Sequence, residues 1–339
     1  MNSRPGVNSA PTVSNFGYEP CTYPESPKNR HLVVETKYIS VDPYMRCRMN
    51  VDSGVDYAKA WGIGETISGF AVGRVLQSTN ESYKKGDLVT STDMSWQWKK
   101  FTVVHSESIR KIDGISEEQS SLTLGIFGLT GLTGAIGVME QGNIQSDLFQ
   151  TVVVSGAAGA CGCVAGQVAK LLGCKKIIGI CGTQEKCSFL EEDLKFNGAV
   201  CYKSENVKQR LAELCPDGVD VYFDNVGGNI SDDVISHMNK CSTVILCGQI
   251  STYNSDVPYP PPLNQASAKL VHANSINRER FLVLSYANKF PSTLAFLSKA
   301  YAEGKLVSKE TISHGLQNAG NAFVQMMSGY NIGKQIVKV

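Results

Sequence analysis

TVVVSGAAGACG, residues 151–162, is the most informative segment of this chain for its architecture. It begins with an apolar run typical of a buried strand, continues into a glycine-rich turn, and opens a helical pattern over Ala160–Leu172 that stops at Gly173. Glycines at such a turn let the backbone approach a pyrophosphate, and the N-terminus of the helix offers N–H groups to it. The stretch therefore predicts a dinucleotide-binding turn.

The glycine spacing of this turn is GxxGxxG, whereas dinucleotide-binding turns usually have GxGxxG. Tight packing of the helix on the strand, without any ligand, would also select glycines. The residues that follow favour the binding turn, because strands and helices alternate as in the doubly wound parallel sheet of an α/β Rossmann domain. The predicted strands are 151–155, 176–181, 199–202, 219–224, 243–247 and 281–284, and the predicted helices are 160–172, 184–196, 207–214, 230–238 and 291–303.

Residues 30–110 show a different pattern, in which short strands are separated by turns. This pattern predicts a small β-barrel or sandwich domain. Residues 1–30 are rich in Pro, Ser and Asn and are predicted as loops, and residues 332–339 are predicted as a final strand that returns to this first domain. The predicted strands of the domain itself are 32–41, 69–76, 88–90 and 101–104.

The segment between the two patterns is rich in glycine. Ser116 is a predicted N-cap followed by acids in a first helical turn, and glycines recur at 125, 128, 131, 134 and 137. A period of three without proline does not indicate collagen. Because each glycine costs ~1 kcal/mol in a helix, the repeat predicts a helical hinge segment whose backbone packs closely against its neighbours.

The composition indicates a globular chain of ordinary charge. The 339 residues suggest two domains, and 42% hydrophobic against 19% charged residues argues against disorder. Lys and Arg number 32 against 31 Asp and Glu, so there is no basic excess for nucleic acid or anionic membranes. We expect a small-molecule substrate, no nucleic-acid or membrane partner, and a monomer or homodimer.

The cysteines and histidines are scattered along the chain. There are 11 cysteines and no CxxC motif, and the polar N-terminus has no apolar signal core, so we expect reduced thiols and a cytoplasmic location. The five histidines have no HxxxH or CxxC partner, which predicts that no metal is bound.

The second strand of the Rossmann pattern bears on the choice of nucleotide. An NAD site usually has an acid about 20 residues after the glycine turn, where it binds the ribose 2′-hydroxyl. Here the strand ends in Cys181, Gly182 and Thr183, without a carboxylate, and Lys186 follows. A solvated surface lysine beside Glu185 would explain Lys186 equally simply, but the missing acid favours NADPH.

Four motifs together resemble the zinc-independent medium-chain reductases, in the branch of the alkenal and prostaglandin reductases. They are VDPYMR at 41–46, AAGACG at 157–162, DNVGG at 224–228 and GQIS at 248–251, and the resemblance runs over residues 2–337. It implies a GroES-like β-barrel catalytic domain at 1–118, a Rossmann NADPH-binding domain at 119–295, and a return to the catalytic domain at 296–339.

The resemblance also implies the site residues. The pyrophosphate would be held by Gly159, Ala160, Cys161 and Gly162, and the 2′-phosphate by Lys186 and Tyr202. The rest of the cofactor would contact Asn225, Cys247, Gly248, Gln249, Ile250, Ser251, Thr252, Tyr253, Phe281, Leu282, Val283 and Asn331. The substrate would face Tyr44, Thr92, Asp93, Leu282, Val283 and Leu284.

The activity implied by the resemblance is reduction of the conjugated C=C of 15-oxoprostaglandins and related α,β-unsaturated ketones. Hydride from NADPH adds to an already electrophilic β-carbon, so no Lewis acid is needed, and Tyr253 donates a hydrogen bond near the carbonyl. Asp93 stands where this branch has an aromatic-rich loop, and an acid there tolerates an acyl carboxylate poorly. A quinone reductase and a non-catalytic NADPH-binding protein remain the alternatives.

A proline-rich segment, PYPPP at 258–262, follows Tyr253. Three consecutive prolines favour polyproline II. The segment is interpreted in three ways: as a stiff strut for a mobile lid, as a docking peptide for an SH3 domain, or as a rigid loop.

Overall fold

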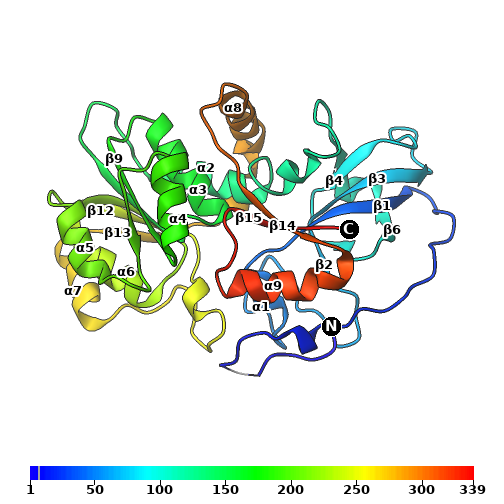
Figure 1. Ribbon diagram of the computed structural model, residues 1–339, viewed down its shortest axis with the longest axis horizontal. Coiled ribbons are helices and arrows are strands. Elements are labelled where there is room, and N and C mark those ends of the chain that lie inside the picture. The colour runs from blue at the N-terminus through cyan, green and yellow to red at the C-terminus, as the bar shows by residue number, and fades with distance from the viewer. Residues whose placement is uncertain (7) are drawn as a thin grey trace. The chain divides into compact units, whose positions relative to one another are not determined.

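The computed structural model describes residues 1–6 and 8–339, and its chain divides into two units (Figure 1). Unit 1 comprises Met1–Gly125 and Glu310–Val339, and unit 2 comprises Ile126–Lys309. The boundaries that the family resemblance implies are 118 and 295. The second boundary lies later because the Gln167 amide bonds to the backbone of Val307, at 2.8 Å to its N–H and 3.0 Å to its C=O.

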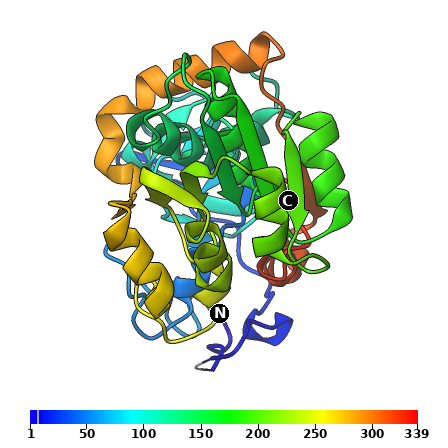
Figure 2. The same cartoon turned by 90° about the vertical axis from the view of Figure 1, so that its left-hand side faces the viewer.

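Unit 2 is built on a six-stranded parallel sheet in the order β10-β9-β8-β11-β12-β13. The strand order reverses between β8 and β11, so right-handed crossovers to either side of that point lie on opposite faces of the sheet. Figure 2 shows these strands between helices. The predicted doubly wound Rossmann fold is confirmed. The strands are β8 (Thr151–Ser155), β9 (Lys176–Cys181), β10 (Gly198–Cys201), β11 (Val219–Asp224), β12 (Met238–Leu246) and β13 (Asn277–Arg280).

The helices of unit 2 pack against this sheet and against one another. Helix α2 lies on α3 with close backbone contact, since a Cβ on Gly134 would come within 2.6 Å of the Cys161 carbonyl oxygen. The close packing predicted from the glycine repeat is therefore present. The helices are α2 (Leu129–Gln141), α3 (Ala160–Leu171), α4 (Gln184–Ser188), α5 (Val207–Leu214), α6 (Gly228–Ile235), α7 (Gln265–Ala273) and α8 (Phe290–Ala302).

Several predicted elements of unit 2 have different bounds. The strand predicted at 281–284 is wrong, because the last strand is β13, which ends at Arg280. Its polar, mostly exposed NRER sequence belongs to an edge strand and has no apolar pattern to reveal it. The helix predicted at 230–238 ends at Ile235, and Met238 opens β12. Helix α4 is followed by a π-helical turn at 189–193, and α7 was not predicted.

Unit 1 holds a seven-stranded sheet with the path β14-β15-β1-β3-β4-β7, and β6 also pairs with β1. The predicted return of the C-terminal strand is confirmed, since β15 pairs antiparallel with β1. Strand β14 and helix α9 were not predicted. The elements are β1 (His31–Ser40), α1 (Met45–Arg48), β3 (Ala71–Ser78), β4 (Leu88–Ser91), β6 (Phe101–His105), β7 (Ile109–Lys111), β14 (Glu310–His314), α9 (Ala319–Met327) and β15 (Lys334–Lys338), with a separate pair β2 (Ser68–Gly69) and β5 (Trp96–Gln97).

The core of unit 1 is closed by Trp96, whose side chain is almost fully buried. Its indole N–H donates to the Thr36 hydroxyl at 3.0 Å. Its ring lies against Gly73, where a Cβ would meet the ring at 2.8 Å and the Glu35 carbonyl oxygen at 2.6 Å. Glycine in the interior of β3 is thus required by the close approach of strand and ring.

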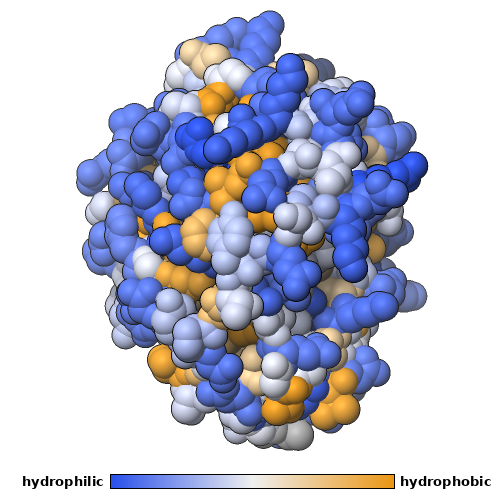
Figure 3. Space-filling model, turned by 90° about the vertical axis from the view of Figure 1, so that its right-hand side faces the viewer, coloured by the Kyte–Doolittle hydropathy of each residue, from blue (hydrophilic) through white to orange (hydrophobic). Residues whose placement is uncertain are grey.

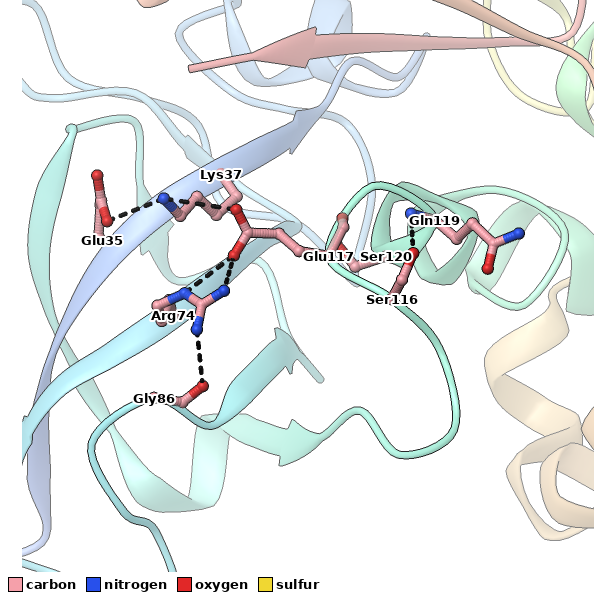
Figure 4. A network of polar contacts seen from close by, with 8 residues as sticks. All are labelled: Glu35, Lys37, Arg74, Gly86, Ser116, Glu117, Gln119 and Ser120. Atoms are coloured by element: carbon pink, nitrogen blue, oxygen red, sulfur yellow. Dashed lines mark hydrogen bonds and ion pairs between the residues drawn. The ribbon is translucent and has the colours of Figure 1, made fainter.

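Glu117 has a role that differs from its prediction as a helix-starting acid. Its carboxylate bonds to Arg74 of β3 and lies 3.6 Å from the Lys37 ammonium of β1 (Figure 4). The Ser116 hydroxyl does accept from the N–H of Gln119, at 3.4 Å, but only a 3-10 turn follows, over Ser120–Leu124. Helix α2 begins later because the chain leaves helical geometry at Gly125 and Gly128.

Hydrophilic residues cover most of the molecular face drawn in Figure 3, and hydrophobic side chains form small patches between them. Such small patches are normal for a protein surface. None of the helices within residues 1–6 and 8–339 has the length and apolar composition needed to cross a bilayer.

Candidate functional site

The predicted cofactor residues of unit 2 all follow the carboxyl ends of the parallel strands. This edge of a doubly wound sheet is where such folds bind ligands, at the point where the strand order reverses. In sheet order the strands are followed by Tyr202 (β10), Lys186 (β9), Gly159–Gly162 (β8), Asn225 (β11), Cys247–Tyr253 (β12) and Phe281–Val283 (β13). Residues far apart in the sequence are thereby brought to one edge.

The glycine-rich turn has the backbone geometry of a phosphate cradle. Gly156 has φ +59°, and Gly162 has no room for a side chain, because a Cβ there would lie 2.4 Å from the Gly156 carbonyl oxygen. Gly159 caps α3 in an extended conformation, and the first helical bond runs from the N–H of Cys163 to its carbonyl at 2.9 Å. The N–H groups of residues 160–162 therefore have no acceptor within the helix.

The end of β9 is followed by Gly182 and Thr183, which carry no carboxylate, and by the buried Lys186. The Thr183 hydroxyl accepts from the N–H of Lys186 at 3.3 Å and so starts α4. The Lys186 side chain is largely buried, and this burial lowers the pKa of its ammonium. The Tyr202 hydroxyl stands 3.1 Å from where a Cβ on Gly182 would lie, so a larger residue at 182 would collide with it.

Asn225, which follows β11, is hydrogen-bonded to the residue just before the cradle. Its side-chain amide donates to the Ser155 carbonyl at 2.8 Å, and its backbone N–H donates to the Ser155 hydroxyl at 3.1 Å. Ser155 is the last residue of β8 and immediately precedes the glycine-rich turn. The two neighbouring strand ends at the point of reversal are therefore bonded to each other.

The loop after β12 is hydrogen-bonded to the turn after β11. The N–H groups of Cys247 and Gly248 donate to the Asp224 carbonyl at 2.9 and 3.0 Å, and the N–H of Ser251 donates to the Val226 carbonyl at 3.1 Å. Within this loop the Tyr253 hydroxyl lies 3.5 Å from where a Cβ on Gly248 would stand. Glycine at 248 thus leaves space beside the hydroxyl.

Two thiols meet at this edge, one from the first turn of α3 and one from the loop after β12. A hydrogen bond with Cys247, together with burial, raises the pKa of the Cys161 thiol well above its usual value. Burial also raises the pKa of Cys163 in the same turn to about 12. The Cys161 and Cys163 thiols are therefore protonated at neutral pH and do not add negative charge beside a phosphate.

The segment after β13 lies at the same edge and is mostly apolar. The N–H of Phe281 continues the strand pairing by donating to the Leu246 carbonyl at 2.9 Å. Phe281 and Val283 are buried, and Leu284 is exposed.

The proline-rich segment is fastened to the sheet within unit 2. The Tyr259 hydroxyl donates to the Leu246 carbonyl at 2.8 Å, and the Arg278 guanidinium donates to the Pro261 carbonyl at 2.8 Å. These two bonds to β12 and β13 favour the interpretation as a rigid loop.

The other predicted residues belong to unit 1. Tyr44 precedes α1, and burial raises the pKa of its hydroxyl well above the usual value. The Thr92 hydroxyl donates to the Glu107 carbonyl of the turn before β7 at 3.4 Å. The Asp93 carboxylate accepts from the N–H of Ser95, within its own exposed loop, at 2.9 Å. The side-chain amide of Asn331 donates to the Gly333 carbonyl at 2.8 Å, just before β15.

Sequence reasoning gave no role to Asp224 and Ser155, although both stand in the quoted motifs. Both side chains are completely buried, and they hydrogen-bond to each other at 3.2 Å. The available signal was a polar residue at the last position of an apolar strand, which is where side chains turn toward a ligand edge.

Comparison with known proteins places this geometry in a family. An N-terminal domain of oxidoreductase matches residues 2–112, and a zinc-binding dehydrogenase domain matches residues 160–299. The NADP(+)-dependent 2-alkenal reductase of Nicotiana tabacum is 36% identical over 316 residues, which span 91% of this chain and 87% of the relative. The chain belongs to the medium-chain dehydrogenase/reductase superfamily.

Other relatives of this medium-chain reductase cover almost all of its length. Prostaglandin reductase 1 of Bos taurus is 32% identical over 332 residues, spanning 97% of this chain and 95% of the relative. The crystal structure of CurA from Vibrio vulnificus in complex with NADPH is 31% identical, covers 100% of this chain and 97% of its own, and superposes with a TM-score of 0.90. The match of the N-terminal residues confirms the small catalytic domain that was expected in addition to the Rossmann domain.

The domain family that matches residues 160–299 is named for zinc-binding dehydrogenases. In the part of this medium-chain reductase that the structure describes, residue 7 excepted, no three His, Cys, Asp or Glu side chains gather as a metal site requires.

Proposed function

We propose that this medium-chain reductase uses NADPH to reduce the conjugated C=C bond of α,β-unsaturated ketones and aldehydes. The observation that supports the proposal most is that one sheet edge holds the phosphate cradle, the buried Lys186 and the Tyr253 hydroxyl together. The predicted cofactor is confirmed, since the family relatives include NADP-dependent enzymes and a structure with bound NADPH.

The residues at this edge fit NADPH in both charge and space. The N–H groups of residues 160–162 and the start of α3 suit the pyrophosphate. The buried Lys186 ammonium suits the 2′-phosphate, and the small Gly182 supplies no carboxylate that would repel it. When bound, NADPH supplies the hydride that adds to the β-carbon of the substrate.

Tyr253 stabilises the oxygen of the substrate in this proposal. As the β-carbon is reduced, negative charge grows on the carbonyl oxygen, and a positioned O–H donor lowers the energy of that charge. We assign this role to the Tyr253 hydroxyl, which lies 3.5 Å from where a Cβ on Gly248 would stand. Apolar side chains after β13, such as Leu282 and Leu284, supply a surface for the hydrocarbon part of the substrate.

The finer assignment is to the prostaglandin reductase 2 type, acting on C13 of 15-oxoprostaglandins. The DPYMR and DNVGG motifs and the likeness to prostaglandin reductase 1 support it. The exposed Asp93 carboxylate in the predicted substrate loop argues for a different range, because it repels a substrate carboxylate. We therefore expect neutral enones and alkenals to be better substrates than 15-oxoprostaglandins.

The decisive experiment follows NADPH oxidation with four substrates: a neutral enone, a 2-alkenal, a 15-oxoprostaglandin and a quinone. The expected product of the enone retains its carbonyl and has gained two hydrogens at the former double bond, as mass spectrometry and NMR can show. Formation of an allylic alcohol, or turnover of the quinone alone, would contradict the proposal. Binding of NADPH without turnover of any substrate would favour a non-catalytic protein.

A further inference from the structure

The carboxylate of Asp224 collects five hydrogen bonds beneath the proposed cofactor site. It is completely buried at the carboxyl end of β11. One oxygen accepts from the Tyr222 hydroxyl at 3.0 Å, from the Ser155 hydroxyl at 3.2 Å, and from the backbone N–H groups of Val226 and Gly227, each at 2.9 Å. The other oxygen accepts from the Ser231 hydroxyl. A buried carboxylate is costly unless it is satisfied in this way.

Two of these bonds shape the turn that follows the strand. By accepting from the N–H groups of Val226 and Gly227, the carboxylate folds residues 224–228 back over the end of β11. Gly227 and Gly228 complete the turn with φ of +72° and +59°, which a glycine adopts at little cost. The backbone carbonyls of 224–226 then face the N–H groups of the loop after β12.

The turn at residues 224–228 is hydrogen-bonded to the loop that bears Tyr253. The carbonyls of Asp224, Asn225 and Val226 accept from loop N–H groups at 2.9–3.2 Å, and the Ser251 hydroxyl adds a bond to Val226 at 2.6 Å. A shift of this turn would therefore move the loop and, with it, the Tyr253 hydroxyl.

The Asp224 carboxylate also orients Ser155, the residue just before the phosphate cradle. The Ser155 hydroxyl donates to the Asp224 carboxylate and accepts from the N–H of Asn225, so its orientation depends on the carboxylate. Because Ser155 immediately precedes Gly156, the start of the glycine-rich turn is held by the same network.

We propose that Asp224 is a positioning residue that couples the phosphate cradle to the loop bearing Tyr253. One buried carboxylate then controls cofactor affinity and the placement of the Tyr253 hydroxyl together. The catalytic half of this inference rests on the function proposed above, whereas the cofactor half is measurable without any turnover.

Asp220 provides a matched control on the same strand. Its carboxylate also accepts two structural bonds, from the N–H of Thr151 at 2.8 Å and from the Asn239 amide at 2.9 Å. It stands near the beginning of β11, however, at the opposite edge of the sheet from the cofactor residues. Asp220→Asn and Asp224→Asn thus make the same chemical change with a different relation to the site.

The test measures the Kd of NADPH by fluorescence titration of both variants, each at a temperature well below its own midpoint of unfolding. We expect Asp224→Asn to raise the Kd about tenfold, because the amide NH₂ cannot accept the bonds that the oxygen accepted. We expect Asp220→Asn to stay within about twofold of the wild type. Equal Kd values for the two variants would overturn the inference.

Steady-state kinetics with an enone distinguish positioning from general damage. Asp224→Asn should raise the KM for NADPH and lower kcat together, whereas Asp220→Asn should change neither, even if both variants unfold earlier. A changed kcat with an unchanged Kd would also overturn the coupling. If the wild type binds NADPH but reduces no enone, the proposed function fails, and the Kd comparison still decides the role of Asp224.

Two milder variants keep the inference testable if Asp224→Asn does not fold. Tyr222→Phe and Ser231→Ala each remove one donor to the same carboxylate. Each should raise the NADPH Kd about threefold, as expected for one lost hydrogen bond. Wild-type Kd values for both variants would overturn the proposal.

Discussion

Two aspartates in the family motifs, Asp42 in unit 1 and Asp224 in unit 2, are buried in different ways. The Asp42 carboxylate lies 3.2 Å from the buried Lys334 ammonium, which also donates to the carbonyls of Val41 and Gln335 at 2.7 and 3.0 Å. The Asp224 carboxylate is held by hydroxyl and amide donors. An opposite charge thus stabilises the Asp42 carboxylate, whereas uncharged O–H and N–H donors stabilise the Asp224 carboxylate.

The two buried carboxylates have different roles in the molecule. The Asp42–Lys334 pair joins the segment after β1 to β15, which is far away in the sequence and pairs with β1 in the sheet of unit 1. Two of the five donors in the Asp224 network, the N–H groups of Val226 and Gly227, belong to its own motif, and the network supports the loop after β12. We therefore expect changes in the first to alter stability, and changes in the second to alter cofactor binding and turnover.

The largest effect is expected from Lys334→Met, which leaves the buried Asp42 carboxylate without its partner. Breaking a buried ion pair from one side typically costs about 3–5 kcal/mol, and we expect a loss of that size in the free energy of unfolding, measured with urea. The exposed Lys338→Met, on the same strand, is the control. The double variant with Asp42→Asn should recover part of the loss, and no recovery would contradict the pair as its cause.

Tyr253→Phe should lower kcat on an enone about 10²-fold, the usual cost of removing one donor to a developing oxyanion. Its NADPH Kd should stay near that of the wild type, because the ring remains. Tyr259→Phe is a suitable control, since its hydroxyl bonds to the Leu246 backbone. Turnover by Tyr253→Phe equal to that of the wild type would remove this residue from the mechanism.

Gly73→Ala and Gly162→Ala test the comparison with the same change in each unit. In both, the new Cβ would meet a backbone carbonyl oxygen, at 2.6 Å from Glu35 or 2.4 Å from Gly156. Each should lose about 1–3 kcal/mol of stability through overpacking. Only Gly162→Ala should also weaken NADPH binding in titration, and an equal weakening by Gly73→Ala would break the distinction between the units.

Lys186→Met should weaken NADPH binding about tenfold while leaving NADH binding nearly unchanged, because only NADPH has the 2′-phosphate. Lys175→Met, an exposed lysine at the other end of β9, is the control. Equal losses for both nucleotides would show that Lys186 supports the fold of α4 rather than the phosphate.

The smallest expected effect is a pH dependence of NADPH binding. Burial lowers the pKa of Lys186, so its ammonium is charged below that lowered pKa and neutral above it. NADPH affinity should therefore fall as the pH rises through the lowered pKa of Lys186, while NADH affinity stays level. Lys186→Arg should move the fall to higher pH, since a guanidinium remains charged. A fall that is identical in Lys186→Arg would assign it to another group.

Much of unit 2 could be predicted because its signals are local. The apolar run of β8, the glycines after it and the following helix are contiguous in the sequence and were placed almost residue by residue. The exposed edge strand β13 was missed, because a strand held by one neighbour and solvent needs no apolar pattern. In unit 1, β14 and α9 were also missed, and Glu117 was taken for a helix start because its partners Lys37 and Arg74 are distant in the sequence.

The doubly wound fold, the glycine cradle and the missing acid at the end of β9 could all be predicted from the amino-acid sequence, since each depends on residues that are neighbours along the chain. In contrast, the three-dimensional fold was needed to show that Asp224 contacts both the strand before the cradle and the turn that holds the Tyr253 loop, and that Lys334 pairs with Asp42. These contacts depend on strand order and burial, because a carboxylate removed from water must find its partners wherever the fold brings donors to it.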